Sequence, residues 1–259
     1  MSESPSRVEP WHSLTQWTSA RIAMGRAGAS MPTASVLEFN SDHALARDAI
    51  HTALDTFLLE RRFAAAGFRT LSAWSRARDR SEYLRRPDLG RSLDPACVPA
   101  LRADDDAQSA TLTVVVADGL SALAPASHAL PLLELLRDGL AQWTLDPVVI
   151  ATQARVALGD EIGQLRRAEA VLVLIGERPG LKSPDSLGAY LTYLPRAGRM
   201  DSERNCVSNI RPAGLTYDQA VFRLLHLLTQ ARVLGATGVS LKDGSDTLRE
   251  LQETDRPRY

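Results

Sequence analysis

The 259-residue chain has little lysine and almost no net charge. Lys182 and Lys242 are its only lysines, and 30 cationic side chains stand against 31 carboxylates, for a formal charge of -1. A protein that binds DNA or RNA mainly through its phosphates needs a strongly basic surface, so this balance of charges argues against a nucleic-acid-binding protein. The cations are otherwise arginine, which suits bidentate and interface pairing, so we expect many of them to contact the rest of the protein or another subunit.

Long apolar runs and a secretory signal are also missing. The longest strongly apolar stretch, residues 170–176, is far shorter than the roughly 18 residues that span a bilayer. The first ten residues contain no apolar h-region, which predicts a cytoplasmic protein without a membrane partner. Cys97 and Cys206 are isolated from each other in the sequence, as is typical of a reducing compartment.

The pattern of apolar residues changes at Asp104–Asp105–Asp106, where we expect a domain boundary. Residues 1–104 have apolar residues at helical spacing and predict a smaller α-rich N-terminal segment. In it, Ser41 or Asp42 can cap a helix with one apolar face, formed by Ile50, Ala53, Leu54, Phe57 and Leu58. Residues 105–242 predict a Rossmann-like domain, and residues 243–259 a polar C-terminal tail.

A basic stretch lies between Arg61 and Arg102. It contains ten arginines and four acidic residues, interleaved with Phe63, Phe68, Trp74 and Tyr83. Basic residues with aromatics can form a surface for single-stranded nucleic acid. In a neutral chain, the favoured interpretation is an arginine-rich face that meets the rest of the protein or another subunit. Salt-dependent binding in a gel-shift experiment would instead support the nucleic-acid surface.

Strands and helices alternate after the boundary. Strands are predicted at residues 111–116, 147–152 and 171–175, with weaker candidates at 189–194 and 205–210. Helices are predicted at 127–143, around Leu158 to Leu165, and from the capping box of Thr216 and Gln219 to a left-handed stop at Gly235. Because the strand at 171–175 is wholly apolar, the pattern indicates an α/β fold with an open, mainly parallel sheet and helices on both faces.

Ligands of such sheets bind beyond the carboxyl ends of the strands. The segments at those positions begin at Asp118, Arg155 and Gly176. The segment Gly176-Glu-Arg-Pro-Gly-Leu-Lys-Ser183 is close to a phosphate-binding loop but has the wrong spacing, and Pro179 removes an N–H that a phosphate cradle uses. Its carbonyls and the Glu177 carboxylate are instead suited to polar amide groups.

The residues alone give no complete catalytic set. Cys206 has no histidine nearby in the sequence, so a small buried hydrophobe is the favoured interpretation over a nucleophile. A metal site is not predicted, since neither Cys-x-x-Cys nor His-Glu-x-x-His occurs. A stand-alone hydrolase or nucleotide enzyme using Asp118, Ser121 and Glu177 stays open as an alternative, and it requires activity in the isolated chain.

Several ordered blocks nevertheless resemble the small (light) chain of ethanolamine ammonia-lyase, from about Ala20 to Lys242. The blocks are Gly25-Arg-Ala-Gly28, Arg86-Pro-Asp-Leu-Gly-Arg91, Ala117-Asp-Gly-Leu-Ser121, Gly176-Glu-Arg-Pro-Gly-Leu181, Ser183-Pro-Asp-Ser-Leu-Gly188, Thr192-Tyr-x-Pro-Arg196 and Glu203-Arg-Asn-Cys-Val-Ser-Asn-Ile210. The resemblance implies the small subunit of an adenosylcobalamin-dependent enzyme that converts ethanolamine to acetaldehyde and ammonia. It further implies that a large subunit holds the substrate and catalyses the reaction, and that the small subunit encloses cobalamin at their interface.

The resemblance also implies site residues. Val156, Glu177 and Cys206 are similar to the family's cobalamin-contacting positions. A Val156 carbonyl and the Glu177 carboxylate would accept N–H groups of the corrin amides, and Cys206 would supply soft packing. Because Asp42 and His43 are adjacent, the Asp-x-His-x-x-Gly loop is absent, which implies a base-on cofactor. The matching blocks begin close to Met1, whereas relatives packaged into a bacterial microcompartment carry a longer extension, so encapsulation stays open.

Overall fold

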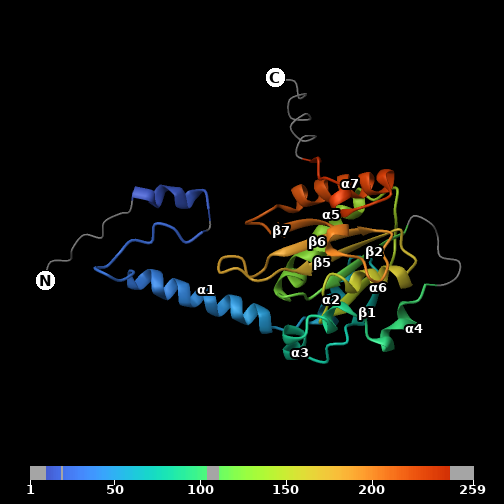
Figure 1. The fold of residues 1–259 in the computed structure, drawn as a ribbon, viewed down its shortest axis with the longest axis horizontal. Coiled ribbons are helices and arrows are strands. Elements are labelled where there is room, and N and C mark those ends of the chain that lie inside the picture. Colours follow the sequence, from blue (N-terminus) through green and yellow to red (C-terminus); the bar gives the residue numbers. More distant parts are fainter. Residues whose placement is uncertain (1–9, 19, 104–110, 246–259) are drawn as a thin grey trace, which may run out of the picture.

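A computed structural model of the chain describes residues 10–18, 20–103 and 111–245 (Figure 1). Its sheet has seven strands in the order β1-β4-β2-β5-β6-β7, with the short β3 also paired to β2. The strands are β1 (Thr70–Trp74), β2 (Thr111–Ala117), β3 (Thr144–Leu145), β4 (Val148–Thr152), β5 (Ala170–Gly176), β6 (Leu187–Tyr193) and β7 (Asn205–Ile210). The helices are α1 (Thr33–His51), α2 (Thr56–Ala65), α3 (Arg80–Arg85), α4 (Val98–Leu101), α5 (Leu130–Asp138), α6 (Leu158–Leu165) and α7 (Tyr217–Leu234).

The predicted α/β class and mainly parallel sheet are confirmed. Strands β1, β4, β2, β3 and β5 pair in parallel, whereas β6 is antiparallel to both β5 and β7. All five strands expected from the sequence are present, including the two weaker ones, which are β6 and β7. These two form a hydrogen-bonded extension of the parallel sheet beyond β5.

Two apolar cores sandwich the sheet. Along β5 every residue is buried, with Leu172 and Leu174 in one core and Val171 and Val173 in the other. Helices α2, α5 and α7 contribute to the first core, and α4 and α6 contribute to the second. Successive strand side chains point to opposite faces, so a strand covered by helices on both sides must be apolar throughout.

Helix α5 is shorter than predicted. The expected helix at 127–143 is a π-helical turn at Pro125–Ala129 followed by α5, which ends at Asp138. Gly139 is the C-cap of α5, and a methyl group there would lie 2.3 Å from the Leu225 side chain of α7, so this packing requires glycine. Helix α7 begins and ends as predicted: a Thr216–Gln219 capping box marks its start, and Gly235 in the left-handed conformation marks its end.

The helix predicted to start at Ser41 or Asp42 is wrong in its limits. Helix α1 starts at Thr33 and ends at His51, and the chain then restarts as α2, where the Asp55 carboxylate accepts a hydrogen bond from the Leu58 amide. Strand β1 was not predicted, and it pairs with β4 in the main sheet. The expected boundary at residues 104–106, and most of the expected tail at 243–259, lie outside the described residues.

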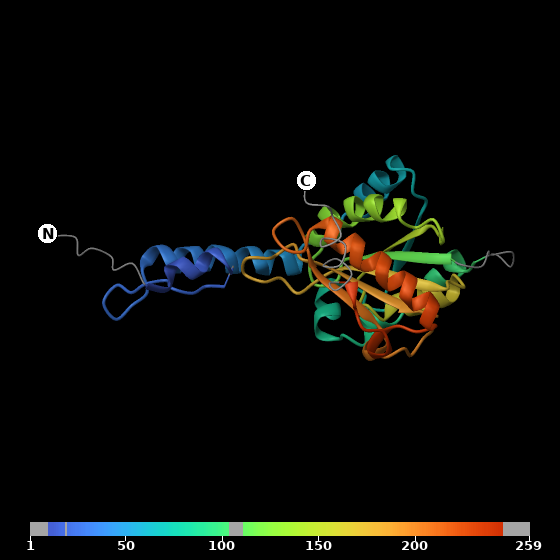
Figure 2. The ribbon, with the colours of Figure 1, turned by 90° about the horizontal axis from the view of Figure 1, so that it is seen from above.

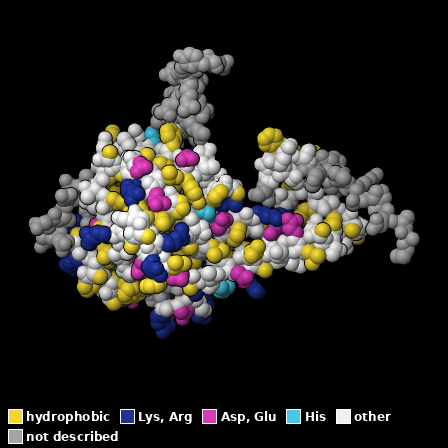
Figure 3. Space-filling view, turned by 180° about the vertical axis from the view of Figure 1, so that it is seen from behind, with side chains coloured by type: hydrophobic (Ala, Val, Ile, Leu, Met, Phe, Trp, Pro, Cys, Tyr) yellow, Lys and Arg dark blue, Asp and Glu magenta, His cyan; other side chains and the backbone are white. Residues whose placement is uncertain are grey.

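The chain before α2 forms an N-terminal arm, residues 10–51, that extends away from the sheet (Figures 1 and 2). Apolar side chains are scattered along it (Figure 3), and Trp11, Trp17, Leu37 and Leu45 are exposed. Within the described ranges, no helix is both long and apolar enough to cross a membrane.

Candidate functional site

The carboxyl ends of β2, β4 and β5 meet at one edge of the sheet. The segments that begin at Asp118, Arg155 and Gly176 therefore lie together, as the sequence predicted. Strand β6 runs the other way, so its first residue, Leu187, reaches the same edge and faces Ile210 of β7. The carboxyl end of β1, which is parallel to β4, also lies there, so six strands contribute loops to this edge.

Two cavities adjoin at the edge. The first, of about 400 Å³, is called the strand-end cavity, and its lining includes Gly119, Ile175, Glu177 and Arg178. The second, of about 320 Å³, is called the Cys206 cavity, and its lining includes Arg91, Asp201, Arg204 and Cys206. Both are lined by Arg155, Val156 and Tyr190. The structure therefore brings the three predicted site residues together: Val156 borders both cavities, Glu177 the first and Cys206 the second.

Glu177 is held by the loop that joins β5 to β6. Its amide donates to the Ser186 carbonyl at 3.0 Å, and its Oε2 accepts from the Ser186 hydroxyl at 2.5 Å and from the Asn209 amide at 3.2 Å. A methyl group on Gly188 would lie 3.0 Å from Oε1, so glycine leaves room for the carboxylate. Oε1 forms no hydrogen bond with the residues that the structure describes, and one carboxylate oxygen thus remains to accept a donor.

Val156 lies in the turn that leads from β4 into α6. Its carbonyl accepts a hydrogen bond from the Gly159 amide at 3.0 Å, while the described chain provides no acceptor for its own amide. The backbone before it is anchored, because the Arg155 amide donates to the Gly90 carbonyl at 2.8 Å. The N–H of Val156 is therefore the more available of its two backbone groups.

Cys206 lies on β7 opposite Tyr190 of β6. Its side chain is open to the cavity, yet the surrounding protein removes enough water to raise the pKa of the thiol, and the nearby Glu177 carboxylate raises it further. Burial likewise raises the pKa of the Tyr190 hydroxyl. Both groups are neutral at physiological pH, which suits packing rather than nucleophilic attack.

Asp118 and Ser121 have structural partners. The Asp118 carboxylate accepts from the Gln153 and Ala154 amides at 2.9 and 3.0 Å, and burial raises its pKa. The Ser121 hydroxyl is fully buried and donates to the Pro184 carbonyl at 2.6 Å. The Asp118 bonds join the loops that follow β2 and β4, and the Ser121 bond joins the loop after β2 to the β5–β6 loop. Neither side chain is free to act on a substrate, as the hydrolase alternative requires.

Many arginines of the 61–102 stretch are used within the chain. Arg62 donates to the Ala126 carbonyl, Arg78 pairs with Glu82, and Arg86 pairs with Asp88. Arg80 donates to the carbonyls of Ile50 and Gly119, and its guanidinium lies 4.9 Å from the centre of the Tyr83 ring. The contacts of Arg62 and Arg80 agree with the interpretation of an arginine-rich face that meets the rest of the protein, whereas Arg78 and Arg86 pair with carboxylates of the same stretch.

Sequence reasoning missed Tyr83, Tyr190 and Arg155 as cavity residues. Tyr83 lies in α3, which follows the unpredicted strand β1, and its buried hydroxyl holds it at the cavity by donating to the Ala154 carbonyl at 3.0 Å. The position of Arg155 is a signal for it in the sequence, since it closely follows the β4 segment and precedes Val156. Tyr190 falls inside a predicted strand, where aromatic residues usually indicate core.

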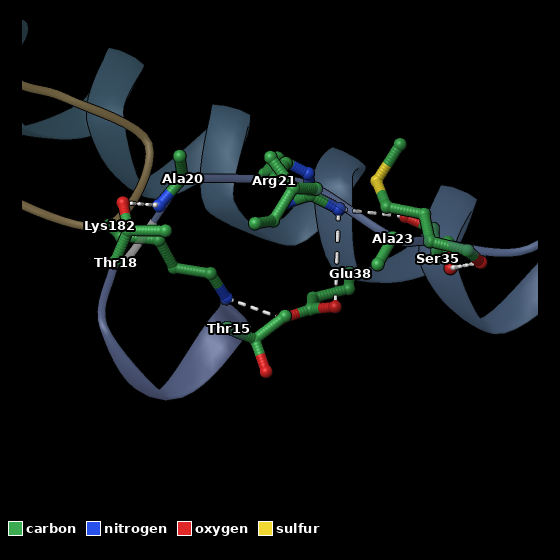
Figure 4. A pocket seen from close by; sticks show the side chains of 10 residues that line it. Thr15, Thr18, Ala20, Arg21, Ala23, Ser35, Glu38 and Lys182 are labelled. Atoms are coloured by element: carbon green, nitrogen blue, oxygen red, sulfur yellow. Dashed lines mark hydrogen bonds and ion pairs between the residues drawn. The ribbon is translucent and has the colours of Figure 1, made fainter. Parts of the chain in front are cut away.

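A third hollow, of about 430 Å³, lies at the arm and contains Lys182 (Figure 4). The Lys182 ammonium pairs with Glu38 and with Asp42, the latter at 2.9 Å, and Arg21 pairs with Asp42 at 2.8 Å. The lysine of the segment that resembles a phosphate-binding loop thus holds the β5–β6 loop to α1. No cluster of three or more potential metal-ligating side chains occurs in the described part of the chain.

Comparison with known proteins gives one consistent result. The family model described as ethanolamine ammonia-lyase light chain (EutC) matches residues 8–242. The chain is 49% identical over 250 residues to the ethanolamine ammonia-lyase small subunit of Azotobacter vinelandii, with 95% of this chain and 93% of that protein covered. It is 52% identical over 252 residues to the protein of that name from Xanthomonas campestris, covering 95% and 92%, and 47% identical over 259 residues to the one from Pseudomonas syringae, covering 98% and 90%.

Proposed function

The chain belongs to the ethanolamine ammonia-lyase light-chain family, and from this premise we propose that it encloses adenosylcobalamin at an interface with a large catalytic subunit. The observation that carries the proposal is the meeting of Val156, Glu177 and Cys206 around two adjoining cavities. Membership makes the chain one subunit of an ammonia-lyase, and therefore part of a hetero-oligomer. The cofactor, its base-on state and the non-catalytic role of this chain are the proposed part.

The residues at the site fit a cobalamin. A corrin has a broad apolar surface rimmed with amide side chains, which present both N–H donors and carbonyl acceptors. Glu177 Oε1 has no bond to a described residue and can accept an amide N–H, whereas the unpaired Val156 amide can donate to an acceptor oxygen of the cofactor. Each cavity has a volume within the roughly 300–1,000 Å³ of ligand pockets. A cobalamin is larger than either, which supports a partner subunit that covers the remainder.

Bound adenosylcobalamin would supply the weak carbon–cobalt bond from which radical deamination of ethanolamine starts. The residues of this chain would bind and orient the cofactor. The Glu177 carboxylate is fixed by Ser186 and Asn209, so it does not have to be ordered when a donor arrives. Cys206 and Tyr190 give a neutral wall, and the protonated thiol offers soft packing without a competing nucleophile. The cavity walls exclude water from one side of the cofactor.

The exposed apolar side chains support a partner. Trp11, Trp17 and Leu37 on the N-terminal arm lie in water in the isolated chain, and so does Phe57 at the start of α2. These four large side chains offer apolar surface that a partner subunit can cover. The arm extends from the body (Figure 2), so it can reach a neighbouring subunit while the β5–β6 loop stays tied to it through Lys182.

The test is copurification. A tagged large subunit from the same organism, coexpressed with this chain, should retain it through affinity and size-exclusion steps, and the complex should deaminate ethanolamine only when adenosylcobalamin is added. Each subunit alone should be inactive. Full activity of the large subunit without this chain, or activity of this chain alone, would refute the proposed role.

A further inference from the structure

Arg155 is held rigidly at the wall shared by the two cavities. Its guanidinium lies 4.4 Å from the centre of the buried Tyr83 ring, and its amide donates to the Gly90 carbonyl. A methyl group on Gly90 would lie 2.8 Å from the Tyr83 ring and 3.0 Å from the Arg155 side chain, so glycine is required for this packing. The Arg155 side chain is therefore positioned before any ligand arrives.

The Arg155 guanidinium has a donor without a partner. Its Nε is buried and has no hydrogen-bond partner in the structure, and it forms no ion pair with the residues at 10–18, 20–103 and 111–245. An unpaired buried donor destabilises the fold, and a charged one does so more, so such groups in native proteins call for an explanation. An acceptor supplied by a ligand provides one.

The other arginines of the Cys206 cavity differ from Arg155. Arg204 pairs with Asp160, and Arg91 lies 3.6 Å from the Asp201 carboxylate. Among the described residues, Arg155 is thus the one guanidinium of the Cys206 cavity whose charge no carboxylate balances, and Arg178 of the strand-end cavity likewise forms no ion pair. Next to Arg155 stands the Val156 amide, which has no acceptor among the described residues and precedes the first turn of α6. Backbone N–H groups at a helix start add to a positive potential.

We infer that Arg155 binds an anionic phosphodiester, with the Val156 amide as a second donor. The inference rests on the proposed function, since within cobalamin that group is the single phosphate that links the corrin side chain to the nucleotide base. The neutral corrin amides offer no charge to balance a guanidinium. Arg155 is accordingly a residue that distinguishes complete cobalamin from corrinoids that lack the nucleotide loop.

The experiment uses the complex of this chain with its large subunit and two probes. Cyanocobalamin contains the phosphate, and dicyanocobinamide contains the corrin amides without it. Dissociation constants are measured by absorbance titration for the wild-type complex and for Arg155→Met, Arg155→Lys and Arg137→Met. Arg137 is the matched control, because its guanidinium also stacks on an aromatic ring, 4.7 Å from the centre of Phe68, and lies outside both cavities.

The expected result is selective. Arg155→Met should weaken cyanocobalamin binding about 30-fold or more and change dicyanocobinamide binding less than about two-fold, as follows from the loss of one buried charge pair. Arg155→Lys should fall between Arg155→Met and the wild type, since it keeps the charge, and it serves if Arg155→Met fails to assemble. Arg137→Met should match the wild type for both probes.

Other results would overturn the inference in distinguishable ways. An equal loss for both probes would assign Arg155 to a corrin amide instead of the phosphate. No loss for either would remove Arg155 from the site altogether. If the wild-type complex bound neither probe, the proposed function itself would fail.

Discussion

Arg204 and Asp160 form an ion pair beneath the Cys206 cavity in which both side chains are 2% exposed. Arg204 Nη1 lies 2.5 Å from Asp160 Oδ1 and 3.2 Å from the Thr192 hydroxyl, and Nη2 donates to the Arg199 carbonyl at 2.9 Å. The pair joins α6 to the segment that enters β7. It therefore fixes Cys206, two residues further along, relative to the sheet.

Breaking this pair should be costly. Arg204→Met leaves a buried carboxylate without its cation, and we expect the free energy of unfolding to fall by about 3–5 kcal/mol in urea titrations. The double variant Asp160→Leu/Arg204→Met should recover most of the loss because no charge then stays buried. Arg86→Met, which breaks the exposed pair with Asp88, is the control and should change stability by less than about 1 kcal/mol. Equal effects for the two single variants would contradict the buried role.

Glu177 should contribute to cobalamin affinity through its free oxygen. Glu177→Gln keeps the shape but removes the charge, so we expect the complex to bind cyanocobalamin about 5–10-fold more weakly with little change in melting temperature. Glu177→Ala should be worse, since the bonds to Ser186 and Asn209 are lost as well. Glu134→Gln, on the exposed face of α5, is the control. Unchanged affinity in both Glu177 variants would remove this carboxylate from the site.

The central strands could be predicted from the sequence, whereas the outermost strand β1 could not. Strand β5 is apolar throughout because both of its faces are covered, so composition alone identifies it. Strand β1 has a single fully buried residue, Ala73, and lies between Arg69 and Arg76, which leaves no apolar run to detect. Position after a strand pointed to Glu177, but the packing of Arg155 on Tyr83 joins residues distant in the chain and required the three-dimensional structure.

Gly119 and Gly176 allow the β2 and β5 loops to touch. A methyl group on Gly119, which has φ +55°, would lie 2.2 Å from the Gly176 carbonyl oxygen, and one on Gly176 would lie 1.9 Å from the Ser121 carbonyl oxygen. Gly119→Ala should therefore lower the free energy of unfolding by about 3 kcal/mol, from overpacking and left-handed strain together.

The control for Gly119 is Gly198→Ala. Gly198 also has a positive φ, of +86°, but a methyl group there meets nothing within 4 Å. Its cost should be limited to about 1 kcal/mol of backbone strain. Similar losses for the two variants would show that conformation alone, without the close approach, explains the need for glycine at position 119.

Cys206 should react slowly although it is exposed. The surrounding protein desolvates the thiol and raises its pKa, and the Glu177 carboxylate raises the pKa further, so at pH 7.5 the reactive thiolate is scarcer than in a free cysteine. Iodoacetamide labelling followed by mass spectrometry should give a rate several-fold below that of glutathione, rising with pH. Glu177→Gln should accelerate labelling because it removes the repelling charge. Labelling as fast as that of a free thiol would contradict the neutral wall.

Glu169 should make the free energy of unfolding depend on pH. The Arg232 guanidinium, bonded to both carboxylate oxygens at 2.8 and 2.9 Å, holds the pKa of Glu169 below its ordinary value of 4.5, and the Tyr193 hydroxyl contributes. Because the pKa of Glu169 is lower in the folded state than in the unfolded state, the contact stabilises the fold at pH values above the unfolded-state pKa. This contribution is lost as the pH falls through the folded-state pKa. The gap in unfolding free energy between the wild type and Glu169→Gln should thus be about 1–2 kcal/mol at pH 7 and shrink below pH 4.5. Urea titrations from pH 7 to pH 3 measure it, and a gap that stayed constant or grew toward low pH would contradict the assignment to the Arg232 contact.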